Sequence, residues 1–153
     1  MKDKELDILL VEDDPADAEL AKRSLQNHER NLKIIVMRDG AEALDFLFCR
    51  GDFSARDMRQ APSVVLLDLK LPRISGHEVL RAIKNDERTK CIPVVVMTSS
   101  DHERDLLECY KGGVNSFVQK PIEVTKFREA IQQLGKYWLR INHAPPEGAF
   151  ATQ

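Results

Sequence analysis

Short apolar runs alternate along the chain with longer segments in which apolar residues recur every three or four positions. An apolar run that stops at a polar or proline-containing cluster is typical of a buried strand, whereas three- and four-residue steps are typical of a helix with one buried face. The pattern predicts five strands, which cover residues 8–11, 33–38, 64–67, 93–97 and 116–119.

A helix is predicted after each of these strands. The helices are marked by Asp14 and Pro15 with a stop near His28, by Asp39-Gly40 with a stop near Gly51, by capping boxes at Ser75–Glu78 and Ser100–Glu103, and by an apolar stripe from Val124 to Ile141. Strands that alternate with helices favour an α/β fold, a doubly wound five-stranded parallel sheet with right-handed crossovers and helices on both faces.

Three segments depart from this alternation. Residues 52–62 are polar and aperiodic, and either a solvated loop or a partner-contact loop would explain so long a connection. The stripe of the last helix is longer than one domain face needs, so its last turns are expected to meet a partner. We therefore predict one domain over residues 1–142 with an extended C-terminal helix, followed by a flexible tail over residues 143–153.

The composition fits a single domain of 153 residues, with 23 Lys and Arg against 25 Asp and Glu and a net charge of −2. Without a basic excess, this chain alone is not expected to bind nucleic acid. The charged start is followed by too few apolar residues for a signal peptide or a membrane span, so the protein is predicted to be cytoplasmic. The cysteines Cys49, Cys91 and Cys109 are odd in number and far apart, and are expected to be reduced.

Carboxylates follow two of the predicted strands. Glu12 and Asp13 end the first strand, and Asp68 ends the third. Open α/β sheets bind their ligands outside the carboxyl ends of the strands, so these acids are expected to converge there. Like charges so close repel one another unless something neutralises them. Carboxylate oxygens suit Mg²⁺ or another hard divalent cation.

Phosphoryl transfer is a reaction that such an edge supports. With a cation bound, an ionised Asp68 can attack a phosphoryl group as a nucleophile. Thr98, after the fourth strand, and Lys120, after the fifth, can each bind a phosphoryl oxygen. Considered by itself, Lys120 would be expected to be a solvated surface lysine. It becomes a candidate phosphate ligand only together with Asp13, Asp68 and Thr98.

Five motifs in this order resemble the receiver domain of two-component response regulators. They are Leu9–Pro15, Asp68–Pro72, Gly76, Met97–Ser99 and Lys120–Pro121, and together they span nearly all of residues 7–142. The resemblance implies a CheY-like, flavodoxin-like (βα)5 fold. It also implies that Asp68 accepts a phosphoryl group from the phosphohistidine of a sensor histidine kinase.

The resemblance assigns a metal site around Asp68. Asp13 and Asp68 would bind Mg²⁺ directly, Lys70 through its main-chain carbonyl, and Glu12 through water. Lys70 and Ser100 also occupy two positions that this family associates with the lifetime of the phosphorylated state. We expect the positive Lys70 side chain to alter that lifetime.

The resemblance assigns the phosphoryl-binding and switch residues as well. Thr98 and Lys120 would contact the phosphoryl group, with Ser99 and Pro121 as structural residues and a cis peptide bond between Lys120 and Pro121. The switch of the family couples the residue at Thr98 to an aromatic ring at Phe117. Because Phe117 has no hydroxyl, gating in this chain would rest on ring packing.

A narrower resemblance, to single-domain regulators paired with phytochrome-type histidine kinases, is carried by residues 51–62, Val114–Phe117 and Lys136–Leu139. It implies homodimers formed through the fourth and fifth helices, the last strand and the C-terminal extension. Such dimers agree with the long apolar stripe of the last helix.

Two other functions remain open from the residues. A Mg²⁺-dependent aspartyl-phosphate phosphatase also uses an Asp after a strand, but it needs a second acid two residues further on, where this chain has Lys70. A receiver-shaped interaction module that never accepts phosphate is the other alternative. Labelling with a small phosphodonor separates it from a phosphoacceptor. A dinucleotide-binding module is disfavoured, because Glu12-Asp13-Asp14 replaces the Gly-rich turn that binds a pyrophosphate.

Overall fold

The fold is a five-stranded parallel sheet in a computed structural model that describes residues 6–27, 29 and 31–150. The strands are β1 (Ile8–Val11), β2 (Ile34–Met37), β3 (Val64–Leu67), β4 (Val94–Thr98) and β5 (Ser116–Gln119). The helices are α1 (Pro15–Gln26), α2 (Gly40–Leu47), α3 (Gly76–Lys84), α4 (Glu103–Lys111) and α5 (Val124–Lys136). The strand order β2-β1-β3-β4-β5 confirms the predicted doubly wound architecture.

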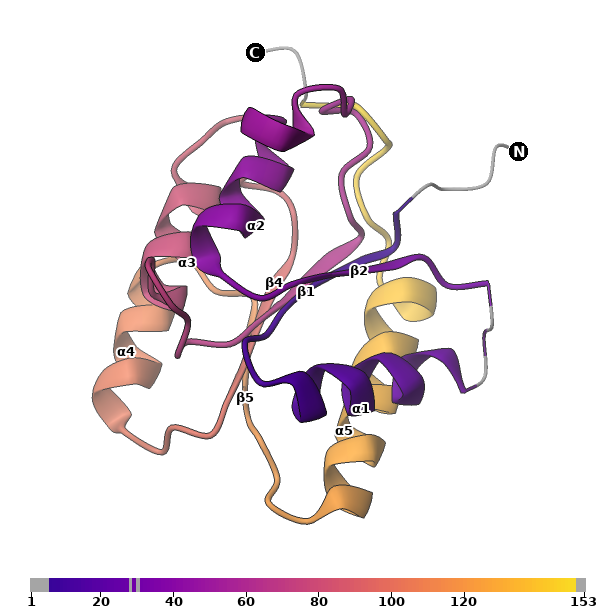
Figure 1. The fold of residues 1–153 in the computed structure, drawn as a ribbon, viewed down its shortest axis with the longest axis vertical. Coiled ribbons are helices and arrows are strands. Elements are labelled where there is room, and N and C mark those ends of the chain that lie inside the picture. Colours follow the sequence, from indigo (N-terminus) through magenta and orange to yellow (C-terminus); the bar gives the residue numbers. More distant parts are fainter. Residues whose placement is uncertain (1–5, 28, 30, 151–153) are drawn as a thin grey trace.

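Helices cover both faces of the sheet (Figure 1). Leu9 and Val11 of β1 pack toward α2, α3 and α4, while Ile8 and Leu10 pack toward α1 and α5. Every residue of β1 and β3 is buried, as expected of central parallel strands covered on both sides. The strand register places the ends of β1 and β3 side by side, with Val11 opposite Leu67.

Two helix ends differ from the predicted ones. Helix α1 stops at Gln26, and His28 lies outside the described residues. Helix α2 stops at Leu47, and Gly51, with a φ of 55°, instead begins a short 3₁₀ turn. The left-handed backbone at Gly51 is easy for glycine, so this residue redirects the chain after the helix has ended.

The predicted capping box at Ser100 is wrong. Helix α4 begins at Glu103, and its N-cap His102 makes no side-chain capping hydrogen bond. The Ser100 hydroxyl donates instead to the carboxylate of Asp105, which lies in the first turn of the helix. In α3, Ser75 is the N-cap as predicted, and its hydroxyl accepts a hydrogen bond from the Glu78 N–H at 3.3 Å.

The predicted last helix is divided in two. Helix α5 ends at Lys136, and a π-helical turn continues over Tyr137–Ile141. Phe127 and Ile131 are buried against the sheet, whereas Ile141 at the end of the stripe is 55% exposed.

The connection over residues 52–62 is more than a solvated loop. The Arg56 guanidinium lies 3.7 Å from the centre of the Phe46 ring and donates to the carbonyl of Gln60 at 2.8 Å. These contacts fix the loop on α2. Residues 144–150 lie beside residues 58–62, and Figure 1 shows this C-terminal segment next to the loop.

None of the helices in the described part of the chain has the length and apolar character needed to cross a bilayer.

Candidate functional site

Acidic side chains converge on one lysine at the carboxyl edge of the sheet. Lys120, which follows β5, contacts Glu12 after β1 with its ammonium group. The same nitrogen lies 3.3 Å from Asp68 Oδ2, after β3, and 3.2 Å from Asp17 Oδ2, in the first turn of α1. The Lys120 and Asp68 side chains are only 10% and 11% exposed, so water screens this contact weakly. The fold therefore brings together three of the predicted site residues, Glu12, Asp68 and Lys120.

The Asp68 carboxylate has one fixed oxygen and one that faces the lysine. Oδ1 accepts a hydrogen bond from the Leu69 N–H at 2.7 Å and a longer one from the Lys70 N–H at 3.4 Å. Oδ2 faces Lys120. The first residue of α3, Gly76, packs against this segment so closely that an added Cβ would lie 2.3 Å from the Asp68 carbonyl oxygen. Glycine at this position thus allows α3 to begin directly beside Asp68.

Burial and pairing shift the pKa values of this cluster in a definite way. Burial raises the pKa of Glu12 to about 7, and the hydrogen bond from Lys120 only partly offsets this. Burial alone would lower the pKa of Lys120, but the hydrogen bond to Glu12 and the charges of Asp68 and Glu12 raise it above its ordinary value. Lys120 therefore stays protonated at neutral pH, and Glu12 takes up a proton more readily than an ordinary glutamate does.

Thr98 lies buried at the end of β4, beside the lysine segment. Its carbonyl accepts a hydrogen bond from the Lys120 N–H at 2.7 Å, and its hydroxyl accepts one from the Ser100 N–H at 3.3 Å. Ser99 is exposed, and Phe117 of β5 is partly buried against the core on the α3 and α4 side. The fold thus holds the backbone of Thr98 and Lys120 together, whereas Phe117 packs with the apolar core.

The predicted cis peptide bond before Pro121 is wrong, since no cis peptide occurs among the described residues. X–Pro bonds favour the trans form by roughly 0.5–1 kcal/mol.

The remaining predicted residues lie at the rim of the site. Asp13 and the Lys70 side chain are exposed. Asp17 was not predicted, because nothing local in the sequence shows that the first turn of α1 faces a lysine 103 positions away. Its place three residues after the N-cap Asp14, beside a strand end, is the signal that could have identified it.

The donors at this edge suit a hard dication. Among the described residues, no three His, Cys, Asp or Glu side chains are already arranged as a metal site, and Lys120 lies between the acids instead. Glu12, Asp17 and Asp68 together nevertheless outnumber the single cationic group that contacts them, and Asp13 adds an exposed carboxylate next to Glu12. Carboxylate oxygens with an excess of negative charge fit such a cation.

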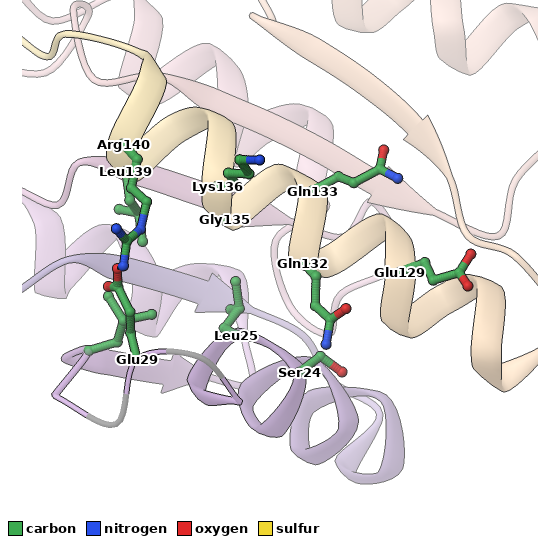
Figure 2. A pocket seen from close by; sticks show the side chains of 11 residues that line it. Ser24, Leu25, Glu29, Glu129, Gln132, Gln133, Gly135, Lys136, Leu139 and Arg140 are labelled. Carbon is green, nitrogen blue, oxygen red and sulfur yellow. The ribbon is translucent and has the colours of Figure 1, made fainter.

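A groove of about 480 Å³ lies elsewhere, between α1 and α5 (Figure 2). Leu25 and Leu139 line its interior, and the ion pair of Glu29 with Arg140 lies at one end. None of the acids that contact Lys120 lines this groove, so it is separate from the candidate site.

The strand order and the acidic edge with its lysine define a flavodoxin-like α/β protein of the receiver class. The model of the family "Response regulator receiver domain" matches residues 8–132, and the chain belongs to this family. Receiver domains accept a phosphoryl group in two-component signalling, so this is a receiver-domain signalling protein rather than a conventional enzyme.

Three relatives place the chain within the family. "Probable methanogenesis regulatory protein FilR2" of Methanothrix harundinacea is 41% identical over 90% of this chain and 86% of its own length. Response regulator Rcp1 of Synechocystis sp. is 36% identical over 86% of this chain and 88% of its own length, and its Mn²⁺-bound structure matches with a TM-score of 0.84. The phosphorylated cyanobacterial phytochrome response regulator RcpA matches with a TM-score of 0.86 at 34% identity, over 92% of this chain and 98% of that one.

Proposed function

We propose that this chain is a cytoplasmic receiver in which Asp68 takes a phosphoryl group from the phosphohistidine of a sensor histidine kinase. The observation that carries the proposal is the asymmetric placement of the Asp68 carboxylate. One oxygen is held by the Leu69 N–H, and the other faces the Lys120 ammonium group at 3.3 Å. A carboxylate held in this way can attack with the oxygen that accepts no backbone hydrogen bond, while the ammonium group next to it stabilises the incoming charge.

Each site residue has a role in the proposal. Asp68 Oδ2 attacks phosphorus as the nucleophile, the P–N bond of the phosphohistidine breaks, and the imidazole of the kinase leaves. Lys120, which stays protonated, binds one oxygen of the transferred group, and the Thr98 hydroxyl binds another. Ser99 and Pro121 shape the backbone that presents these two groups.

A divalent cation, Mg²⁺ in our proposal, would be held by Asp13, Asp68, the Lys70 carbonyl and, through water, Glu12. It would supply neutralising positive charge next to the transferred group. The excess of carboxylates at this edge supports the assignment, as does the Mn²⁺-bound structure of the relative Rcp1.

Labelling with a small phosphodonor tests the assignment of Asp68. The chain is incubated with Mg²⁺ and acetyl phosphate and weighed by intact-mass spectrometry. We expect one phosphoryl group on the wild type and on the control Asp101→Asn, which changes an exposed aspartate outside the cluster. We expect none on Asp68→Asn and much slower labelling of Lys120→Ala. An unlabelled wild type would support an interaction module that does not accept phosphate. Multiple turnover of a phosphomonoester would support a phosphatase.

We propose that the kinase is of the phytochrome type. RcpA is described as a phytochrome response regulator, and its fold covers nearly all of this chain. The similarity to FilR2, a methanogenesis regulatory protein by name, provides the competing candidate. Phosphotransfer from a purified phytochrome kinase should be faster than transfer from an unrelated histidine kinase. Equal rates would remove the phytochrome assignment and leave the role of Asp68 intact.

We further propose that the chain forms a homodimer through α4, β5 and α5. Leu107 and Tyr110 of α4 and Val124 of α5 are each more than half exposed, and Ile122 between β5 and α5 is fully exposed. Exposed large apolar side chains of this kind are candidates for a protein interface. Leu107→Glu with Ile122→Glu should give a folded monomer in sedimentation, and an unchanged mass would contradict this. Trp138 is less suitable as a probe, because it packs against the core on the α1 and α5 side.

A further inference from the structure

A chain of polar contacts links α4 to its neighbours. The Ser100 hydroxyl, in the loop after β4, donates to Asp105 Oδ2 in α4. The other carboxylate oxygen, Asp105 Oδ1, lies 3.0 Å from Nε2 of His77 in α3. Asp105 therefore joins the loop, α4 and α3. Among the residues of α4, all of which are described, Cys109 is the only one that is buried, so these polar contacts form a large part of its attachment.

The protons in this cluster can be placed consistently. Hydrogen bonds from Ser100 and His77 lower the pKa of Asp105, so it is a carboxylate that accepts from both. His77 Nδ1 lies 3.7 Å from the Cys109 sulfur. Burial raises the pKa of the Cys109 thiol to about 11, so the thiol keeps its proton and can donate to Nδ1. With Nε2 as donor to Asp105 and Nδ1 as acceptor from the thiol, His77 has a partner at each ring nitrogen. Glu108 Oε2 also faces Nδ1, at 3.7 Å.

The other end of this chain of contacts reaches the phosphoryl site. The Ser100 N–H donates to the hydroxyl of the fully buried Thr98 at 3.3 Å. In the proposed function, that hydroxyl turns to an oxygen of the phosphoryl group on Asp68. This rotation of the Thr98 hydroxyl would remove the acceptor of the Ser100 N–H. Ser100 is also the residue whose hydroxyl donates to Asp105 in α4.

We propose that Asp105, oriented by His77, is a positioning residue that ties Ser100 and the Thr98 hydroxyl to α4, so that phosphorylation of Asp68 changes how firmly α4 is held. The inference rests on the proposed function of Asp68. Phe117 has no hydroxyl through which a hydrogen-bonded route from Thr98 could pass. The hydrogen-bonded contacts from Thr98 through Ser100 to Asp105 instead end on α4, which exposes Leu107 and Tyr110. A change in how α4 is held would therefore alter the surface offered to a partner.

Hydrogen exchange of the α4 amides tests the inference on the full chain, with and without labelling by acetyl phosphate and Mg²⁺. In the unphosphorylated protein, Asp105→Ala should lower the protection of the α4 amides by about tenfold, because a hydrogen bond to a charged group is lost. Phosphorylation should then change α4 protection in the wild type and hardly at all in Asp105→Ala. The matched control Arg104→Ala, whose side chain is 89% exposed on the same helix, should behave as the wild type.

Two further variants separate positioning from general stability. Asp105→Asn keeps a group that can hydrogen-bond both Ser100 and His77, so it should restore most of the coupling. In a Ser100→Ala background, Asp105→Ala should have little further effect on the response, since members of one network are not additive. Loss of the response in Arg104→Ala, or additive effects of Ser100→Ala and Asp105→Ala, would overturn the inference.

The outcomes also distinguish this inference from the proposed function. A wild type that is labelled on Asp68 and responds in α4 equally with and without Asp105 would overturn the role of Asp105 alone. A wild type that cannot be labelled would overturn the proposed function and the inference with it.

Discussion

Helices α3 and α4 lie on the same face of the sheet and contain nine residues each, yet they are held in different ways. Helix α3 buries Val79, Leu80 and Ile83 and begins with a Ser75 cap. Helix α4 buries Cys109 and begins without a side-chain cap, and polar contacts of Asp105 hold its first turn. Helices with few buried apolar contacts open locally at lower free energy. The difference makes α3 a fixed support for Asp68 and α4 the element that can respond.

Truncating one apolar side chain in each helix should produce the largest difference in stability between changes in α3 and changes in α4. Ile83→Ala in α3 removes a fully buried side chain and should lower the free energy of unfolding by about 2–5 kcal/mol. Leu107→Ala in α4 removes a side chain that is 54% exposed and should change it by less than about 0.5 kcal/mol. Urea titrations measure both. A cost for Leu107→Ala as large as that for Ile83→Ala would contradict the difference between the two helices.

The acids of the two polar clusters should respond to pH in opposite directions. The pKa of buried Glu12 is raised from 4.5 to about 7, so between these values the folded state binds more protons than the unfolded state and stability falls as pH rises. With a chelator present, the free energy of unfolding of the wild type should fall by on the order of 2–3 kcal/mol between pH 5 and pH 8. The Glu12→Gln variant should not show this fall. Added Mg²⁺ should reduce this loss by stabilising the ionised acids.

The pKa of Asp105 is lowered, so its stabilisation is complete at neutral pH and is lost only as pH falls through the acid range. The protection of the α4 amides that depends on Asp105 should therefore be lost only in the acid range, whereas the Glu12-dependent stability changes as pH rises toward 7. A wild type and a Glu12→Gln variant with parallel pH profiles would contradict the assignment for Glu12.

The helix starts provide a smaller test. Ser75→Ala removes the cap of α3 and should lower the free energy of unfolding by about 0.5–2 kcal/mol. His102→Ala at the start of α4 removes no side-chain capping hydrogen bond and should have little effect. Thermal unfolding of the two variants compares them directly. Equal shifts would show that capping does not distinguish these helices.

Lys70 should show the smallest effect on stability. Its side chain is exposed, so Lys70→Ala and Lys70→Asn should change the free energy of unfolding by less than about 0.5 kcal/mol. We expect both to change the rate at which phosphate is lost from Asp68, because Lys70 is two residues from Asp68 and its N–H lies 3.4 Å from the Asp68 carboxylate. Unchanged dephosphorylation rates in both variants would end this hypothesis.

The sequence predicted the strands and the acids at their ends because these signals are local. Apolar runs such as residues 64–67 end abruptly at Asp68, and the Ser75 cap lies next to the helix it starts. The misplaced cap at Ser100 and the unpredicted Asp17 share a cause. Both depend on side chains brought together by packing, where Ser100 prefers Asp105 to the helix start and Asp17 meets Lys120 across 103 positions. Pattern and spacing do not contain that information.

Locating the phosphoryl group tests the central claim most directly. The chain is labelled with Mg²⁺ and acetyl phosphate, reduced with borohydride to convert an aspartyl phosphate to homoserine, and then digested for peptide mapping. We predict homoserine at position 68 in the wild type, and none at positions 12, 13 or 17. Homoserine at one of the other acids, or a modification that persists in Asp68→Asn, would contradict the claim that the fold prepares Asp68 as the phosphoacceptor.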